Sequence, residues 1–194
     1  ITYDAAMSFS RIGYTFDGWS DGVNTRAAGY ATTMGGQNLT VIAQWIIAPP
    51  SAPTISSVTA ADSSATITVA PGVGGGAPIS YTVTANPGGA TCLVISPATS
   101  CSISPLTNGT TYTFSATATN SAGTSTAVTS SPITPAGVPA APGAVSAVRG
   151  NGQATVTVTP LAESATGGKA ITSYTITAYD AAGNAVGTPC QVIP

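Results

Sequence analysis

Side chains that could carry out acid–base or nucleophilic chemistry are scarce in this chain. It has no histidine, so it has neither a Ser-His-Asp triad nor the commonest metal ligand. A glycosidase would need two carboxylates about 5 to 10 Å apart across one cleft. The carboxylates are spread along the whole chain, at Asp4, Asp17, Asp21, Asp62, Glu163 and Asp180. The sequence therefore predicts a protein that is not an enzyme, with no catalytic residue, cofactor or metal.

Two short motifs could imitate functional sites. Asp17 and Asp21 flank Gly18-Trp-Ser20, and we predict that both serve as turn residues that bond to nearby backbone. A weak calcium site is the alternative, although the spacing does not match an EF-hand loop. The glycine-rich segment Gly72–Gly76 lacks the Gly-Lys-Ser/Thr ending of a phosphate-binding loop, and we predict a flexible loop between strands.

Charge and hydropathy exclude two classes of partner. The net charge is −2 with only four cationic side chains, too few for a stripe that could neutralise nucleic-acid phosphates. The apolar runs are far shorter than the roughly 20 residues of a membrane-spanning helix. Trp19 and Trp45 could stack on sugar rings. We predict that they belong to an aromatic core, with a carbohydrate-binding face as the alternative.

Three cysteines bear on the compartment. Cys92 and Cys101 flank a short turn-rich segment, a spacing that suits a disulfide closing a hairpin-like connection. Such a short loop would stabilise the fold by about 2.7 kcal/mol on the chain-entropy estimate. Two free thiols remain the alternative. Cys190 occupies a position like that of Cys92 relative to an upstream tyrosine, so we predict that its partner lies outside the chain. Paired cysteines favour an extracellular location.

These residues must be positioned by strands, because apolar and hydroxyl side chains alternate along the chain. Hydrophobic residues make up 43% and charged residues only 5% of the sequence, and no segment has helical spacing with caps. The fold class is therefore predicted as all-β. The residues predicted to face inward are Ala65, Ile67, Val69, Ile79, Tyr81, Val83, Ala85, Tyr112, Phe114, Ala116 and Ala118.

Proline-rich joints divide the chain into three domains, at residues 1–48, 53–135 and 140–194. The second and third domains repeat one another: Ala65-Thr-Ile-Thr-Val-Ala-Pro71 recurs as Ala154-Thr-Val-Thr-Val-Thr-Pro160, and the Tyr-Thr-Val-Thr-Ala segment at Tyr81 recurs at Tyr174 as Tyr-Thr-Ile-Thr-Ala. The second copy stops about halfway, so the chain is expected to be a piece of a longer modular protein.

The second domain resembles bacterial fibronectin type III domains. The resemblance rests on Ala65-Thr-Ile-Thr-Val69, Ile79-Ser-Tyr81 and Leu106-Thr-Asn-Gly-Thr-Thr-Tyr112, followed by Ala116-Thr-Ala-Thr-Asn-Ser-Ala-Gly123. It implies tandem fibronectin type III or immunoglobulin-like sandwiches. It also implies a tyrosine corner formed by Leu106 and Tyr112, in which the phenol hydroxyl ties a connection to nearby backbone.

The first domain is similar to the Listeria–Bacteroides repeat, a small β-grasp-like module of bacterial surface proteins. Gly13-Tyr-Thr-Phe-Asp-Gly-Trp19 and the closing Ala43-Gln-Trp45 carry this resemblance. Both module types imply a bacterial protein at the cell surface or outside the cell.

These observations predict a function without catalysis. We expect a structural segment of a large bacterial cell-surface or secreted repeat protein, which acts as a spacer or assembles into an extracellular fibre, filament or sheath. Its partners would be neighbouring copies of itself or further modules of the parent chain. The alternatives are an adhesin or carbohydrate-binding module, which would bind carbohydrate or a host surface, and an accessory region of a secreted hydrolase.

Overall fold

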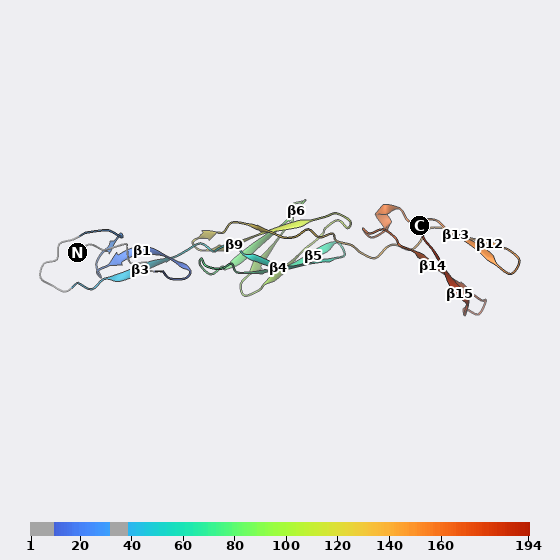
Figure 1. Ribbon diagram of the computed structural model, residues 1–194, viewed down its shortest axis with the longest axis horizontal. Coiled ribbons are helices and arrows are strands. Elements are labelled where there is room, and N and C mark those ends of the chain that lie inside the picture. The colour runs from blue at the N-terminus through green and yellow to red at the C-terminus, as the bar shows by residue number, and fades with distance from the viewer. Residues whose placement is uncertain (1–9, 32–38) are drawn as a thin grey trace. The chain divides into compact units, whose positions relative to one another are not determined.

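The computed structural model describes residues 10–31 and 39–194 and is all-β (Figure 1). A single 3-10 turn, Glu163–Ala165, is the one helical element among these residues. The chain divides into two compact units. The boundary between them runs through strands β4 (Thr54–Ala61) and β5 (Ser64–Ala70). We call the three domains of the sequence analysis the first segment (residues 1–48), the central domain (residues 53–135) and the third segment (residues 140–194). The first unit holds the described part of the first segment and most of the central domain. The second holds the remainder of the central domain and the third segment.

The first segment contains one small antiparallel sheet. Its strand order is β2-β1-β3, with β1 at Tyr14–Ser20, β2 at Thr25–Arg26 and β3 at Ile42–Ile47. The register shifts between Phe16 and Gly18, so Asp17 lies at a β-bulge and not in a turn as the sequence predicted. Asp21 lies in the turn after β1.

The central domain consists of two sheets that share one core. One has the order β4-β5-β8, with β8 at Ser100–Ile103. The other has the order β10-β9-β6-β7, and β11 also pairs with β9. The bounds of its strands are Ser80–Asn86 for β6, Thr91–Ile95 for β7, Thr113–Asn120 for β9, Gly123–Thr124 for β10 and Val128–Thr129 for β11.

Strict alternation along these strands builds the core. In β9, every second residue is buried, because Phe114, Ala116 and Ala118 are fully enclosed while the hydroxyl residues between them are half-buried. The predicted inward residues of β5 and β6 are likewise buried. Ile79 is the exception: it is 59% exposed because it precedes β6 in the loop.

The third segment contains two separate hairpins. Strands β12 (Val145–Arg149) and β13 (Ala154–Val158) form one, and β14 (Tyr174–Tyr179) and β15 (Ala185–Val192) form the other. Tyr174 is the one buried hydrophobic residue among them. Its hydroxyl accepts a hydrogen bond from the Leu161 N–H at 2.9 Å, which fixes the ring although little else in the segment is enclosed.

Candidate functional site

The most extensively built site of the described residues is a contact between a linker and a glycine loop. Residues 48–52 enter the central domain, and residues 72–76 and Asn120 hold them; we call this contact the linker clasp. The Gly76 N–H donates to the Pro49 carbonyl at 3.1 Å. Pro50 forms a bridge with Gly75. The proline-rich linker is therefore docked along its length on the domain that follows it.

Asn120, at the end of β9, supplies the polar anchor of the linker clasp. It is the one buried polar side chain of the described residues, at 6% exposure. Its Nδ2 donates to the Ala48 carbonyl at 2.9 Å, and its Oδ1 accepts from the Ala122 N–H at 2.8 Å. Both ends of the amide are thus bonded, as burial of a polar group requires.

The glycines of the clasp are needed because two backbones approach closely. A Cβ added to Gly76 would overlap the Ala48 carbonyl oxygen and the Asn120 amide, and one added to Gly75 would overlap the backbone of the linker. Gly75 also has a φ of 64°, which favours glycine. The segment is a loop between β5 and β6, as its composition predicted, and its lack of side chains also serves packing against the linker.

A groove of about 460 Å³ adjoins the clasp within the first unit. The glycine loop lines it together with Ile12, Tyr14 and Ile47, and no carboxylate, lysine or arginine does. Most of its lining consists of glycine, proline and apolar residues, with Ser51, Asn120 and Ser121 among the polar ones.

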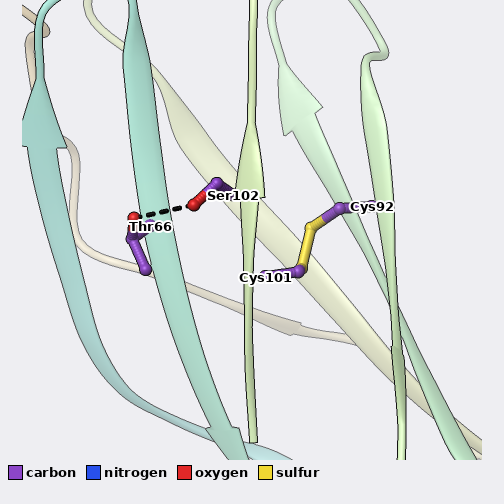
Figure 2. Close-up of a disulfide and its surroundings, with 4 residues drawn as sticks. All are labelled: Thr66, Cys92, Cys101 and Ser102. Atoms are coloured by element: carbon purple, nitrogen blue, oxygen red, sulfur yellow. Dashed lines mark hydrogen bonds between the residues drawn. A yellow bond between two sulfur atoms is a disulfide. The ribbon is translucent and has the colours of Figure 1, made fainter. Parts of the chain in front are cut away.

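A disulfide joins the two sheets of the central domain. Cys92 on β7 and Cys101 on β8 are bonded, with their Cα atoms 6.1 Å apart. The next residue of β8, Ser102, shares a hydrogen bond of 2.9 Å with Thr66 of β5. Figure 2 shows β8 tied in this way on both sides, by the disulfide to β7 and by the hydroxyl pair to β5. This strand links the sheets covalently, and a disulfide is compatible with an extracellular domain.

Leu106 and Tyr112 lie in the connection between β8 and β9 of the central domain. Both are buried, and the Tyr112 hydroxyl accepts a hydrogen bond from the Thr107 N–H at 3.1 Å. This is the local tie that the tyrosine-corner resemblance implies. Beside it, the Asn108 side chain accepts from the Ser63 N–H at 2.8 Å and donates to Asp62 at 2.7 Å, so the amide of this Asn-Gly-Thr motif is engaged in holding two turns together.

Trp19 and Trp45 lie in one aromatic cluster on the first-segment sheet. Phe16 meets both rings edge to face, with centroids 5.3 Å from Trp19 and 5.5 Å from Trp45. All three side chains are half-buried. Such T-shaped contacts are a favourable geometry for aromatic pairs, so the cluster is held in place while part of each ring faces outward.

The titratable groups serve local structure. The Asp21 carboxylate accepts from the N–H groups of Val23 at 2.9 Å and Asn24 at 2.7 Å, and these bonds, that from Asn24 first, lower its pKa. Within residues 10–31 and 39–194, no three His, Cys, Asp or Glu side chains gather where they could hold a metal ion. Asp4 lies outside the described residues.

Cys190, on β15, is a free and exposed thiol, and it lies opposite Ile176 of β14. In the central domain, Cys92 lies opposite Val83, the residue that Ile176 matches in the repeat.

Among the described residues, no helix has the length and apolarity that crossing a bilayer demands.

Comparison with known proteins identifies the central domain. Residues 48–135 match the fibronectin type III domain family, so the chain contains such a domain, and the match spans the linker clasp. Domains of this family are generally non-catalytic and suggest a modular structural or binding role. No curated protein matches the chain.

Several solved structures share similarity with the chain. A structure described as FN3tt mut is 21% identical, with 42% of this chain and 91% of that chain covered and a TM-score of 0.33. The twitchin kinase region of C. elegans is 26% identical, with coverages of 45% and 16% and a TM-score of 0.33. The FN1–FN3 domains of chicken CNTN1 are 22% identical, with coverages of 75% and 51% and a TM-score of 0.39.

Proposed function

We propose, with the fibronectin type III domain at residues 48–135 as premise, that this chain is a non-catalytic spacer segment of a large bacterial cell-surface or secreted repeat protein. In this role the domains transmit position and load along the parent chain and take part in its assembly into an extracellular fibre, filament or sheath. The resemblance of the first two segments to modules of bacterial surface proteins supports the bacterial and extracellular parts of the proposal.

The linker clasp is the observation that carries the proposal. A spacer must limit motion where its domains join, and a free Pro-rich linker would only set their distance. Here the Pro49 carbonyl accepts a backbone bond from the Gly76 N–H and Pro50 forms a bridge with Gly75, and Pro53 is fully buried. The domain thus begins within the linker itself, which leaves few freely rotating bonds at this joint.

The far end of the domain has a second joint of the same kind. Pro135 is fully buried, and its carbonyl accepts from the Gly109 N–H at 2.9 Å. Within the second compact unit, the Gly137 N–H then donates to the Gly167 carbonyl at 2.8 Å. A Cβ on Gly167 would overlap the Gly137 backbone. Both joints use glycines to bring backbones into direct contact.

The surface chemistry supports lateral assembly. Hydroxyl side chains bond to one another across exposed strand pairs, as in Thr66 with Ser102 at 2.9 Å and Thr119 with Thr124 at 3.0 Å. With charged residues at only 5% of the chain, two such surfaces can meet while few ions lose their hydration.

The test is the mobility of the linker backbone. In the unsubstituted chain, we expect ¹⁵N order parameters of about 0.85 at the Ser51 and Ala52 amides, the value of rigid backbone. Gly76→Ala should lower them toward about 0.6, because the added methyl displaces the linker. Gly143→Ala is the matched control, since a Cβ there meets only ordinary contacts. A mobile linker in the unsubstituted chain would refute the spacer role.

A carbohydrate-binding role is a second candidate, supported by the half-buried aromatic cluster of Phe16, Trp19 and Trp45. Sugar rings stack on such faces. Titration with cell-wall and host polysaccharides should then quench tryptophan fluorescence, and Trp45→Ala should abolish the response. An unchanged spectrum across the polysaccharide panel would exclude this role.

A further inference from the structure

Two of the asparagines in this chain are followed directly by glycine, at Asn108-Gly109 and at Asn151-Gly152. Such a pair can react without an enzyme, because glycine has no Cβ to keep its backbone nitrogen away from the asparagine side chain and its φ and ψ are the least restricted. The other asparagines precede bulkier residues or, at Asn86, a proline that has no N–H. The sequence alone therefore assigns the same reactivity to both pairs.

The reaction is deamidation through a cyclic imide. The Gly109 nitrogen loses its proton and attacks Cγ of Asn108, the bond from Cγ to Nδ2 breaks, and ammonia leaves with that proton. Water then opens the ring by breaking one of its two C–N bonds. Cleavage at Cγ leaves aspartate at position 108. Cleavage at the main-chain carbonyl leaves isoaspartate, whose backbone runs through Cγ and is one carbon longer.

The groups that would react at Asn108 are all engaged in hydrogen bonds. Its Nδ2 donates to Asp62 Oδ1 at 2.7 Å, and its Oδ1 accepts from the Ser63 N–H at 2.8 Å. The Gly109 N–H donates to the Pro135 carbonyl at 2.9 Å. The side chain is therefore held against the β4–β5 turn, so its Cγ cannot swing over the Gly109 nitrogen. That nitrogen is itself bonded through the proton that it would have to lose.

Backbone packing adds a second restraint within the same compact unit. A Cβ placed on Gly168 would overlap the Gly109 nitrogen and the Asn108 backbone. Gly168 therefore covers the reacting peptide bond, which cannot turn toward the side chain unless this loop moves. These contacts belong to the second joint described above, in which Pro135 meets Gly109. The asparagine becomes reactive only when this joint opens.

The products of the reaction do not fit the closed joint. A carboxylate at position 108 can accept from the Ser63 N–H, but it cannot donate to Asp62, and the two carboxylates would face each other. Asn108 and Gly109 also lie inside a turn that the Thr110 N–H closes on the Thr107 carbonyl at 3.3 Å. Isoaspartate adds one backbone atom to this turn, so the turn loses its geometry.

We infer that Asn108-Gly109 is a latent deamidation site, which is unreactive while the second joint is closed and is converted after the joint has opened. Conversion leaves a joint that cannot close as before, so the fold carries a one-way record of its own opening. The only co-reactant is water. This inference does not rest on the spacer role.

The first test compares the two Asn-Gly pairs in one full-length chain. Asn151 and Gly152 are exposed in the β12–β13 turn and serve as the unshielded reference. In mildly alkaline buffer, peptide mass spectrometry should find deamidation at residue 108 at least about tenfold slower than at residue 151, because reaction at residue 108 waits for local opening. In urea the two rates should converge. Equal rates in native buffer, or a residue 108 that stays slow in urea, would overturn the inference.

The second test removes one restraint. Asp62→Ala takes away the acceptor of the Asn108 Nδ2, so deamidation at residue 108 should quicken while that at residue 151 is unchanged. Asp21→Ala is the matched control, because it removes another turn carboxylate that bonds to local backbone, and it should change neither rate. An unchanged rate at residue 108 in Asp62→Ala would overturn the inference.

The third test asks whether the joint closes over the product. In an Asn151→Gln background, the full chain is converted at residue 108 in alkaline urea and returned to native buffer. Its Gly109 amide hydrogen should exchange at least about tenfold faster than in a chain kept in mildly acidic urea, where the ring forms slowly. Equal exchange would show that the joint closes over the product and would overturn the one-way character of the site.

Discussion

The same strand sequence behaves differently in two regions of this molecule. In the central domain, Ala65, Ile67 and Val69 are at most 1% exposed. Their repeats in the third segment are exposed at Ala154 and only half-buried at Val156 and Val158. The alternation of side chains is identical, so the difference comes from what lies opposite. In the central domain, β6, β7 and β9 form a second sheet over this face, whereas within residues 10–31 and 39–194 β12 and β13 pair only with each other.

The comparison shows that the alternation of side chains specifies a strand and its two faces, whereas the burial of one face depends on strands from elsewhere in the chain. Tyr174 shows how far local contacts alone can bury a side chain. Its hydroxyl finds a local partner in the Leu161 N–H and its ring is buried, although the strand around it lacks cover. Local ties therefore survive without the second sheet, but the aliphatic core does not.

The largest expected effect is the loss of stability on removing the cysteine at position 92 and its disulfide partner, compared with removing the corresponding Cys190. Replacing both Cys92 and Cys101 with serine should lower the free energy of unfolding of the central domain by about 2.7 kcal/mol, because the unfolded chain gains the entropy of the opened loop. Cys190→Ser should leave stability unchanged, since its thiol is free and exposed. Denaturant unfolding with both variants measures the difference, and equal losses would contradict the assignment.

A smaller loss of stability is expected when the valine at one repeat position is replaced by alanine in each copy. Val69→Ala should destabilise the central domain by roughly 2 kcal/mol, from lost methyl burial and the cavity left behind. Val158→Ala should cost well under 1 kcal/mol, since this side chain is only half-buried. Urea titrations of the two variants provide the values. A Val158→Ala loss as large as that of Val69→Ala would mean that the third segment has a closed core.

Removal of the hydroxyl of Tyr112 or of Tyr174 should affect the stability of the central domain differently. Tyr112→Phe should cost the central domain about 1 kcal/mol, because the Thr107 N–H loses its acceptor. Tyr174→Phe removes the acceptor of the Leu161 N–H and should leave the unfolding of the central domain unaffected. Following central-domain unfolding through its own NMR signals distinguishes the two, and a shared loss would show that the regions unfold as one.

The smallest effect concerns pH and the hairpin turns. Hydrogen bonds from the Asn184 N–H above all, and then from its side chain, lower the pKa of Asp180 below the ordinary 3.8. Because the folded pKa is lowered, the stabilisation of this turn is present above about pH 4 and is lost as pH falls through the folded pKa. The β6–β7 turn, residues 87–90, has no carboxylate. The protection factors of the Ala182 and Asn184 amides, measured relative to the intrinsic exchange rate at each pH, should therefore fall with acid, whereas that of Gly89 should not; parallel acid responses would refute this cause.

Much of the fold follows from the sequence because strands and turns are local. Period-two alternation predicted the buried residues of β5, β6 and β9, and the short cysteine spacing predicted the disulfide. Ile79 was wrong because alternation does not show where a strand begins. Asp17 was wrong because a bulge looks like a turn in sequence.

The linker clasp could not be predicted, because it joins residues 48–52 to a loop and to Asn120, far away along the chain. A run of glycines indicates equally a mobile loop or a close backbone contact. The nearest signal in the sequence was that the chain has both a proline-rich and a glycine-rich segment. A glycine-rich loop has no side chains in the way, so the stiff backbone of a proline-rich linker can pack directly against it.

Hydrogen exchange at two matched amides tests the central comparison most directly. The Val69 N–H donates to the Thr99 carbonyl at 2.8 Å within a covered sheet, so its exchange should require global unfolding of the central domain. Val158, at the same repeat position, pairs with Val145 in a two-stranded hairpin in which the neighbouring Thr159 N–H donates to the Ala144 carbonyl. The Val158 N–H therefore points away from β12, and it should be at least about 100-fold less protected, which corresponds to about 2.8 kcal/mol. Equal protection at Val69 and Val158 would contradict the account.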